Sequence, residues 1–407
     1  MAQEQVLGLD IGSSGVKAVI GEVVGPDKIK LYSGFLKPSK GVRRGIVVDM
    51  EEAAGVITSV LQEVKSYSKA ALRNIYLAVG SSDVRAQMSH GIVAVSRANA
   101  EIYKDDVSRV IQASEAINLP SNRLLLHTIT REFIVDDIGD IRDPMGMVGT
   151  RLEVISMIID AFQPAVRNLM KCVELSGGSV SGVIFTPLAS AIAVLTKNQK
   201  ELGVVLIDIG YGTTGMAVYE ENKLLHTKTF PVGAGHVTND LAIALKIPVE
   251  AAERLKLSYG YALAREVSGK ETIDLKKVDA SLRGAPSRKF IAEVIEARLS
   301  EICGLVNAEL RSIDRAVKLP AGAVIVGGGA KLPGIADLLR SELKLSAQVG
   351  LPQPSVFEAT SPYTAELLES PEGTAALGLI RWSGELNPRK ASLKGGVVAK
   401  FLRNFLP

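Results

Sequence analysis

The chain is poor in several residues that build small functional sites. Its 407 residues include only two cysteines, one tryptophan and four histidines. Cys172 and Cys303 form no CxxC pair and stand near no histidine cluster, which excludes a zinc-finger type of site and a disulfide framework. We therefore expect a reduced protein without structural zinc.

Long apolar runs and a strong charge of one sign are also missing. No run of about 18 uncharged apolar residues occurs, so we expect no helix that spans a bilayer. Residues 1–5 hold no basic stretch ahead of an apolar core, so we expect no signal peptide. The net charge of +3 is too small for a protein that coats nucleic acid. With 47% hydrophobic and 22% charged residues, the chain is typical of a globular protein with two large domains.

What the sequence does have is an internal repeat. Residues 7–19 read Leu-Gly-Leu-Asp-Ile-Gly-Ser-Ser-Gly-Val-Lys-Ala-Val, and residues 206–218 read Leu-Ile-Asp-Ile-Gly-Tyr-Gly-Thr-Thr-Gly-Met-Ala-Val. Each copy opens with an apolar strand that ends in Asp-Ile-Gly. Two such halves predict a duplicated α/β architecture with a cleft between them.

Periodic patterns fill in both halves. We expect strands at 6–10, 16–22, 74–79, 182–185 and 204–209, and helices at 166–176 and 188–196. A further helix should begin after Asp49, a helix N-cap, with Ile57, Val60, Leu61 and Val64 on one face. Residues 81–161 alternate on their own, with strands near 91–95, 124–134 and 152–160 and a helix near 104–117, which predicts a small α+β insertion.

Each copy of the repeat is suited to bind phosphate. Glycines permit a tight turn that points backbone N–H groups at an anion, and the neighbouring hydroxyls add donors. The candidate phosphate-binding residues are Gly12, Ser13, Ser14, Gly15 and Lys17 in the first loop and Gly210, Gly212, Thr213 and Thr214 in the second. Asp10 and Asp208, at the strand ends, are candidates to hold Mg²⁺ through water, because that ion keeps much of its hydration shell. Either copy alone also fits an ordinary hairpin, whereas both copies together favour a phosphate clamp.

A third glycine-rich loop completes an ordered set. A buried-type strand at 323–326 runs into Gly327, Gly328 and Gly329, followed by Ala330, and glycine lets backbone approach a flat base or ribose closely. The set of three loops resembles the actin, heat-shock chaperone and sugar-kinase superfamily. That resemblance implies two lobes, each with a five-stranded sheet, and ATP with Mg²⁺ bound between them. It also implies nucleotide contacts from Glu253 and Lys256 and from the turn that holds Gly233, Gly235 and His236, although His236 equally suits a histidine that only stabilises its own turn.

The insertion narrows the resemblance to one family. Segments 127–136 and 141–153, together with 41–49 and 328–335, are similar to FtsA, a family of actin-like bacterial cell division proteins, and the similarity runs from residue 6 to the last residue. It implies self-association into actin-like protofilaments, recruitment of the tubulin-like protein FtsZ through its C-terminal peptide, and contact with other division proteins. Candidate peptide contacts are Arg288, Lys289 and Arg298 on a helix of the second lobe, which a plain solvated helix face would explain as well.

The same resemblance sets the expected domain boundaries. The first-lobe core should take residues 1–83 and 162–197, with the inserted subdomain at 84–161. The second-lobe core should take 198–228 and 311–383, with an outer subdomain at 229–310. A flexible linker at 384–395 should then precede an amphipathic helix at 396–407.

That last helix is expected to bind anionic membrane lipid. At about 100° per residue, its apolar residues occupy one half of the circumference and its basic residues the other. The candidate membrane contacts are Val397, Val398, Lys400, Phe401, Leu402, Arg403, Phe405 and Leu406. Burial of the apolar face and attraction of the basic groups act together, which predicts a peripheral protein on the cytoplasmic side of the membrane at the division site. The alternative is a helix that docks on the protein's own core.

The expected catalytic position holds no acid or amide. Related ATPases place an acid or amide after the strand that precedes the interlobe helix, where this chain has Thr186-Pro187-Leu188, so we expect ATP binding with slow hydrolysis at most. Competing interpretations are a PilM-like adaptor of a type IV pilus machine, a sugar-kinase-like phosphotransferase and an MreB-like filament protein. The C-terminal helix, the lack of a catalytic aspartate motif and the insertion, respectively, argue against these three.

Overall fold

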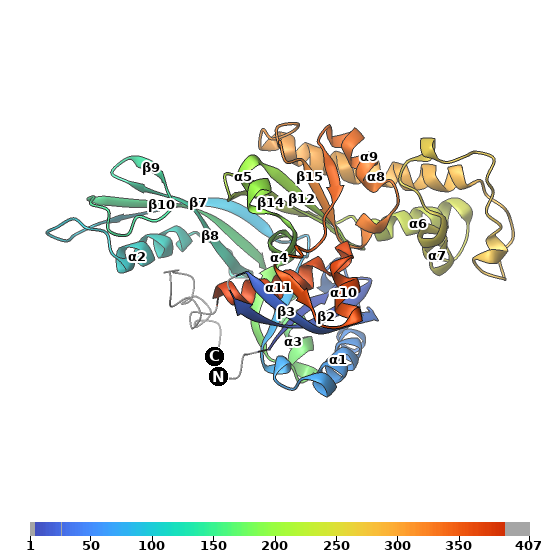
Figure 1. Cartoon of the computed structure of the whole chain (residues 1–407), viewed down its shortest axis with the longest axis horizontal. Helices are drawn as coiled ribbons and strands as arrows, with labels where there is room; N and C mark the ends of the chain where they lie inside the picture. The colour runs from blue at the N-terminus through green and yellow to red at the C-terminus, as the bar shows by residue number, and fades with distance from the viewer. Residues whose placement is uncertain (1–4, 26, 387–407) are drawn as a thin grey trace.

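The computed structural model describes residues 5–25 and 27–386, and they form two lobes with a third sheet projecting from one side (Figure 1). The predicted amphipathic helix at 396–407, and the linker beyond residue 386, lie outside the described residues. No helix in the described part of the chain is long and apolar enough to cross a membrane.

The first lobe is built on a six-stranded sheet in the order β11-β6-β1-β2-β3-β17. These strands are β11 (Val180–Phe185), β6 (Ile75–Val79), β1 (Val6–Ile11), β2 (Gly15–Gly25), β3 (Lys28–Pro38) and β17 (Phe357–Ala359). The central strand β1 is buried along nearly its whole length, as expected for a strand covered on both faces. We expected five strands here, and the sixth is the three-residue β17, which pairs in parallel with β3.

The second lobe repeats the same core topology. Its sheet has the order β14-β13-β12-β15-β16, formed by β14 (Lys223–Phe230), β13 (Thr214–Glu220), β12 (Val204–Ile209), β15 (Ala323–Val326) and β16 (Ala347–Val349). In each lobe the repeat forms an antiparallel pair, β1 with β2 and β12 with β13, and its first strand pairs in parallel with a later one. The duplicated α/β architecture predicted from the repeat is therefore confirmed.

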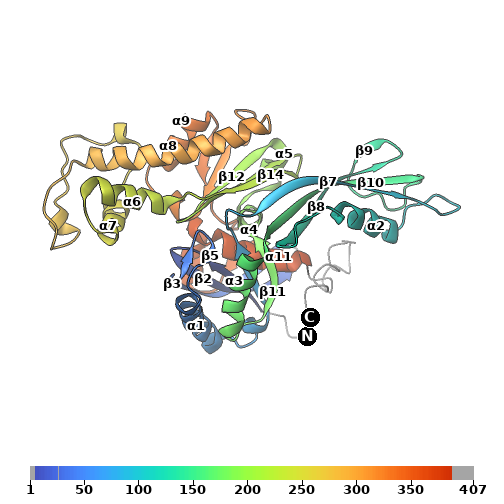
Figure 2. The same cartoon turned by 180° about the vertical axis from the view of Figure 1, so that it is seen from behind.

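Helices cover the first sheet on both faces. On the outer face, α1 (Met50–Tyr67) and α3 (Gln163–Leu175) pack side by side over β1 and β6 (Figure 2). Asp49 caps α1 as expected, because its carboxylate accepts a hydrogen bond from the Glu52 N–H at 3.0 Å. The short helix α10 (Pro362–Leu368) flanks β3 and β17.

Between the two sheets lie α4 (Thr186–Val194) and α11 (Thr374–Leu386), whose side chains share one core with β12 and β15 (Figure 1). The approach is close because small residues face each other. A side chain on Gly378 would overlap the Ala189 carbonyl, and one on Gly8 would overlap the Ala376 carbonyl. Together with β17, this packing places residues 357–386 against the first sheet, so the expected second-lobe boundary of 311–383 is wrong for this segment. The pairing depends on contacts far apart in the chain, which local sequence patterns do not report.

The second lobe carries five helices, α5 (Lys197–Leu202), α6 (Ala234–Leu245), α7 (Val249–Tyr259), α8 (Arg288–Ser312) and α9 (Ile335–Leu343), within the described residues. Short 3₁₀ turns are η1 (Ala71–Arg73), η2 (Ala264–Glu266), η3 (Leu275–Lys277), η4 (Gly328–Lys331) and η5 (Pro371–Gly373). Helices α6 and α7 and part of α8 extend away from the sheet at one end of the molecule (Figure 1).

The insertion is a four-stranded sheet in the order β7-β10-β8-β9 with α2 (Lys104–Glu115) packed against it. Its strands are β7 (Arg85–Ala94), β10 (Arg151–Phe162), β8 (Arg123–Val135) and β9 (Ile138–Ile141). The predicted α+β insertion is present, with the extra strand β9. A separate small hairpin, β4 (Val42–Arg43) and β5 (Ile46–Val47), precedes α1.

Candidate functional site

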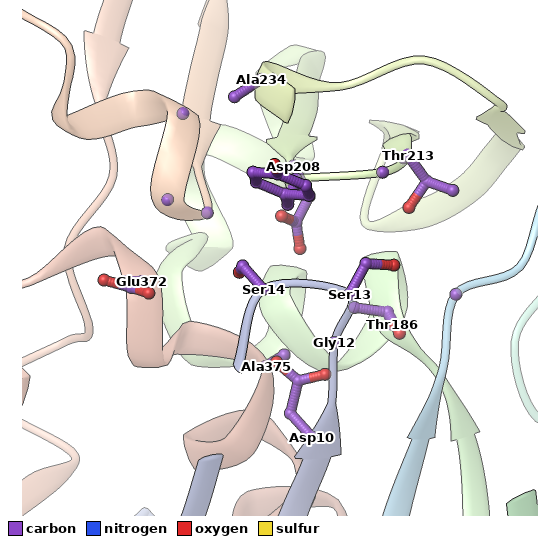
Figure 3. Close-up of a pocket in the computed structure, with 18 of the residues that line it drawn as sticks. Asp10, Gly12, Ser13, Ser14, Thr186, Asp208, Thr213, Ala234, Glu372 and Ala375 are labelled. Carbon is purple, nitrogen blue, oxygen red and sulfur yellow. The ribbon is translucent and has the colours of Figure 1, made fainter. Parts of the chain in front are cut away.

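A cavity of about 370 Å³ lies between the lobes (Figure 3). The lining includes Asp10, Gly12, Ser13, Ser14 and Lys17 from the first repeat and Asp208, Gly210, Gly212 and Thr213 from the second. It also includes Gly327, Gly328 and Gly329 of the third loop and Glu253 and Lys256 of α7. The structure thus brings most of the predicted site residues, which are far apart in the sequence, around one space.

The two repeat loops close in the same way. The Gly12 N–H donates to the Gly15 carbonyl at 3.0 Å, and the Gly210 N–H donates to the Thr213 carbonyl at 2.9 Å. Ser13 and Ser14 face Asp208 and Thr213 across the cavity (Figure 3). The loops therefore present hydroxyl groups to a common space from opposite lobes, which is the arrangement expected of a clamp on an elongated anion.

The first loop contains a buried cation between two carboxylates. Lys17 Nζ lies 3.8 Å from Asp10 and 3.5 Å from Glu372. Burial alone would lower the pKa of Lys17, but the attraction of Asp10, Glu372 and Asp208 raises it, so the ammonium stays charged. Burial raises the pKa of Asp10 despite the neighbouring Lys17. A phosphate that entered the cavity would therefore compete with these carboxylates for the Lys17 ammonium.

Asp208 occupies the matching strand end in the second lobe. The Ser190 hydroxyl donates to its carboxylate at 2.8 Å. Burial raises the pKa of Asp208 to about 6, and the nearby Asp10 adds to the rise, while Ser190 and Lys17 oppose it. No group of three or more His, Cys, Asp or Glu side chains that could form a closed metal cage occurs among the described residues. Two isolated carboxylates fit a hydrated Mg²⁺ and do not fit a dehydrated ion.

The other end of the cavity is formed by α7 and the third loop. Lys256 Nζ lies 2.7 Å from Glu253 and donates to the Thr238 hydroxyl at 2.8 Å. It also lies 5.8 Å from the centre of the Tyr211 ring. Burial lowers the pKa of Lys256, and Glu253 offsets part of that shift. The Lys256 ammonium is thus held by Glu253 and Thr238. The aliphatic part of Lys256 and the Tyr211 ring form a wall of the cavity.

Six predicted residues do not line the cavity: Gly15, Thr214, Gly233, Gly235, His236 and Ala330. Thr214 is fully buried, and its hydroxyl donates to the Val232 carbonyl at 2.8 Å. Ala330 is buried in η4, and Gly15 serves through its carbonyl in closing the first loop. These three residues shape the loops and do not face the cavity.

The turn before α6 supports the second loop. The Ala234 and Gly235 N–H groups donate to the Gly210 and Tyr211 carbonyls, each at 2.8 Å. These donors, which the sequence suggested for phosphate, are therefore already used by the loop. His236 Nδ1 lies 3.2 Å from the nitrogen and 3.3 Å from the oxygen of Gly233, so the ring contacts its own turn, as the turn-histidine interpretation expected.

Sequence reasoning missed several lining residues, among them Tyr211, Lys331, Glu372 and Gly45. Glu372 pairs with both Lys17 and Lys331, at 3.5 and 3.3 Å. Burial would raise the pKa of Glu372, but the two lysines hold it below its usual value. Glu372 stands alone in a Ser-Pro-Glu-Gly turn, which is no recognised site motif. Gly41 and Gly45, by contrast, lie close enough in the sequence to predict a tight turn near Gly45.

The candidate peptide contacts lie on α8 and do not line the cavity. The Arg288 guanidinium lies 3.1 Å from Glu271 and donates to the Tyr259 carbonyl, while that of Arg298 lies 2.6 Å from Asp240. Lys289 is exposed next to Phe290, which is 40% exposed. The two arginines are therefore tied to neighbouring segments, and Lys289, which has no ion-pair partner among the described residues, lies beside an apolar ring.

Solved structures of other proteins share this architecture. A chain of the PilM–PilN type IV pilus biogenesis complex is 20% identical with a TM-score of 0.64, over 93% of this chain and 98% of that one. MreB5 of Spiroplasma citri bound to AMPPNP is 14% identical with a TM-score of 0.55, over 95% and 98% of the two chains. With its paired sheets and interlobe cavity, the protein is a two-lobed member of the actin-like fold.

The sequence comparisons are more specific. Residues 205–378 match the family model of cell division protein FtsA, and residues 81–159 match that of the SHS2 domain inserted in FtsA. Cell division protein FtsA of Pseudomonas aeruginosa is 35% identical over 349 residues, which are 86% of this chain and 83% of that protein. The chain belongs to the FtsA family of cell division proteins. The pilus-adaptor and sugar-kinase alternatives are not favoured, because the sequence comparisons show the FtsA family. The likeness to PilM, at 20% identity, concerns the fold alone.

Proposed function

We propose that this protein binds ATP with Mg²⁺ in the interlobe cavity and, in that state, assembles into actin-like protofilaments on anionic lipid. There it would tether the FtsZ ring to the cytoplasmic face of the membrane at the division site and recruit other division proteins. Membership of the FtsA family supports the cell-division role. The related MreB5 carries AMPPNP in its solved structure, which supports a nucleotide as the ligand.

The observation that carries the nucleotide proposal is the pair of loops that close alike and face each other over Lys17. Ser13, Ser14 and Thr213 would bind phosphate oxygens, and Lys17 would neutralise part of their charge. Asp10 and Asp208 would hold Mg²⁺ through its water ligands, and the ion would screen the charge of the terminal phosphates. Gly327, Gly328 and Gly329 leave room for the nucleoside.

We further propose that hydrolysis is slow. Among the described residues that line the cavity there is no histidine, glutamine or asparagine. Thr186, at the start of α4, lines the cavity, and the resemblance to related ATPases implies that a residue here would orient the attacking water. A hydroxyl is a weak base for that purpose. The nucleotide would then act mainly as an assembly switch.

The nucleotide proposal is tested by titrating a fluorescent ATP analogue with and without Mg²⁺. We expect saturable binding by the natural chain and a loss of about tenfold or more in affinity for Lys17→Met, because a charge-assisted contact disappears. Lys40→Met on the surface is the matched control and should bind normally. Failure of the natural chain to bind any nucleotide would overturn the proposal.

The membrane proposal is tested by co-sedimentation with anionic vesicles, with and without ATP. We expect the full chain to sediment and a chain that ends at Gly395 to stay in solution. The FtsZ C-terminal peptide should sediment only with the full chain, and Lys289→Glu should weaken its capture because the peptide is expected to be acidic and apolar. Equal sedimentation of both chain lengths would exclude residues 396–407 as the membrane anchor.

A further inference from the structure

The hairpin of β4 and β5 has an unusual turn at the mouth of the cavity. Val42 pairs with Val47 and Arg43 with Ile46, which leaves Arg44 and Gly45 as a two-residue turn. Both turn residues have positive φ, 50° for Arg44 and 74° for Gly45. A long charged side chain is uncommon in that conformation, so the hairpin holds Arg44 in place at some conformational cost.

The turn contacts both phosphate loops. The Gly45 N–H lies 3.4 Å from the Ser13 hydroxyl, and Gly45 lines the cavity. From the opposite lobe, Gly212 comes so close that a Cβ there would lie 3.0 Å from Ser13 Oγ and 3.1 Å from Arg44 Cα. Ser13 and Thr213 lie on the side of the cavity away from Glu372 (Figure 3). The hairpin therefore stands at the end of the cavity where the two loops meet.

The side chain of Arg44 has no acidic partner among residues 5–25 and 27–386. It is exposed, and its guanidinium makes one contact, with His236 Nε2 of the second lobe at 3.5 Å. His236 Nδ1 lies 3.2 Å from the Gly233 nitrogen and 3.3 Å from the Gly233 oxygen, so these contacts fit either tautomer of the ring. The charged guanidinium of Arg44 therefore has a ring nitrogen as its one hydrogen-bond contact in the described part of the chain.

We propose that Arg44 distinguishes a nucleoside triphosphate from a diphosphate by binding the terminal phosphate. A phosphate oxygen is a charged acceptor that a ring nitrogen cannot match, and the planar guanidinium can hold two oxygens at once. The contact joins the first-lobe hairpin to the second lobe through the ligand, so it exists only when the third phosphate is present. This inference rests on the proposed nucleotide binding in the cavity.

The test compares ATP and ADP affinities of three chains in Mg²⁺, measured by displacement of a fluorescent nucleotide. Arg44→Asn removes the charge and keeps a residue that tolerates positive φ. The matched control is Arg43→Asn on the same hairpin, whose side chain is also exposed. We expect Arg44→Asn to lower ATP affinity about tenfold, as for loss of a charge-assisted hydrogen bond, and to leave ADP affinity within about twofold. Arg43→Asn should keep the natural ratio.

The ratio of the two affinities is the deciding readout, because a general loss of folding lowers both. If the natural chain binds both nucleotides and Arg44→Asn keeps its ATP-to-ADP ratio, the inference is overturned while the proposed function stands. If the natural chain binds neither nucleotide, the proposed function fails and this inference fails with it.

Discussion

The ammonium of Lys17 lies 3.5 Å from the carboxylate of Glu372, and this ion pair links the start of β2, just after the first glycine-rich loop, to the segment that leads into α11. Lys331 approaches the same carboxylate to 3.3 Å from the third loop. The Gly327 N–H also donates to the Pro371 carbonyl at 2.9 Å. A single short turn, η5, therefore contacts both ends of the cavity.

The first prediction concerns competition for Lys17. A bound phosphate would take the ammonium that Glu372 holds in its absence, so we expect Glu372→Gln to raise nucleotide affinity several-fold, the size of a partly exposed ion pair. Glu369→Gln, an exposed residue of the same segment, is the matched control and should change little. Titration of a fluorescent nucleotide measures both. Weaker binding by Glu372→Gln would mean that Glu372 serves to bring the lobes together.

The second prediction concerns the cost of an ionised Asp208. Its pKa of about 6 exceeds the usual 3.8, so the folded state binds a proton more tightly than the unfolded state does. Its contribution to stability is therefore lost as pH rises from about 4 through 6. We expect Asp208→Asn to stabilise the nucleotide-free protein at pH 7.5 by on the order of 2 kcal/mol, with no gain at pH 4.

Thermal unfolding at the two pH values checks this expectation. The surface substitution Asp337→Asn, whose side chain is 54% exposed, should have little effect at either pH. The same Asp208→Asn chain should lose the Mg²⁺ dependence of nucleotide binding. If Asp208→Asn lowered the free energy of unfolding at pH 7.5, an ionised Asp208 would not be costly in the folded state, whatever the variant's nucleotide affinity.

The third prediction concerns His127, which joins the insertion to the first lobe. Its Nε2 accepts the Phe185 N–H at 3.0 Å, and its ring lies 5.3 Å from that of Trp382. Burial lowers the pKa of His127 from 6.5 to about 4, so its stabilising contribution is present above pH 6.5 and is lost as pH falls towards 4. We expect a loss of roughly 2 kcal/mol over that range.

Fluorescence of Trp382, the single tryptophan of the chain, reports this unfolding. His127→Gln keeps an acceptor for the Phe185 N–H and should flatten the decline in stability between pH 6.5 and 4. Met88→Leu, at an exposed and non-titrating position of β7, is the control and should retain the natural pH dependence. Identical profiles for His127→Gln and the natural chain would contradict the assignment.

The fourth prediction concerns the contact between α11 and α4. A Cβ on Gly378 would overlap the Ala189 backbone, so we expect Gly378→Ala to destabilise the protein by about 3 kcal/mol. In α1, Gly55 has nothing within 4 Å of an added Cβ, so Gly55→Ala should stabilise by about 0.5–1 kcal/mol through helix propensity. Denaturant unfolding distinguishes the two, and equal effects would disprove the close packing.

The sequence predicted the parts of the fold and site that depend on local patterns. The repeat around Asp10 and Asp208 predicted two matching strand pairs. The spacing of apolar residues predicted α1 and the α+β insertion. It could not predict β17, because Phe357–Ala359 is too short to show a period. Glu372 was missed for a related reason, since its role arises from packing against Lys17 and not from any motif. The turn at Arg44 needs the positive φ values of the structure to be recognised.

The return of β17 and α11 to the first sheet affects how the chain is made. Residues 204–349 supply every strand of the second sheet and are contiguous, so all its strands are made before residues 357–386 are. The first sheet, by contrast, lacks its edge strand and the helix over Gly8 until the last described residues emerge. Because α11 also packs on β12 and β15, a message cut short before residue 357 should yield a second sheet with all its strands but one uncovered face, beside a first sheet that lacks its edge strand.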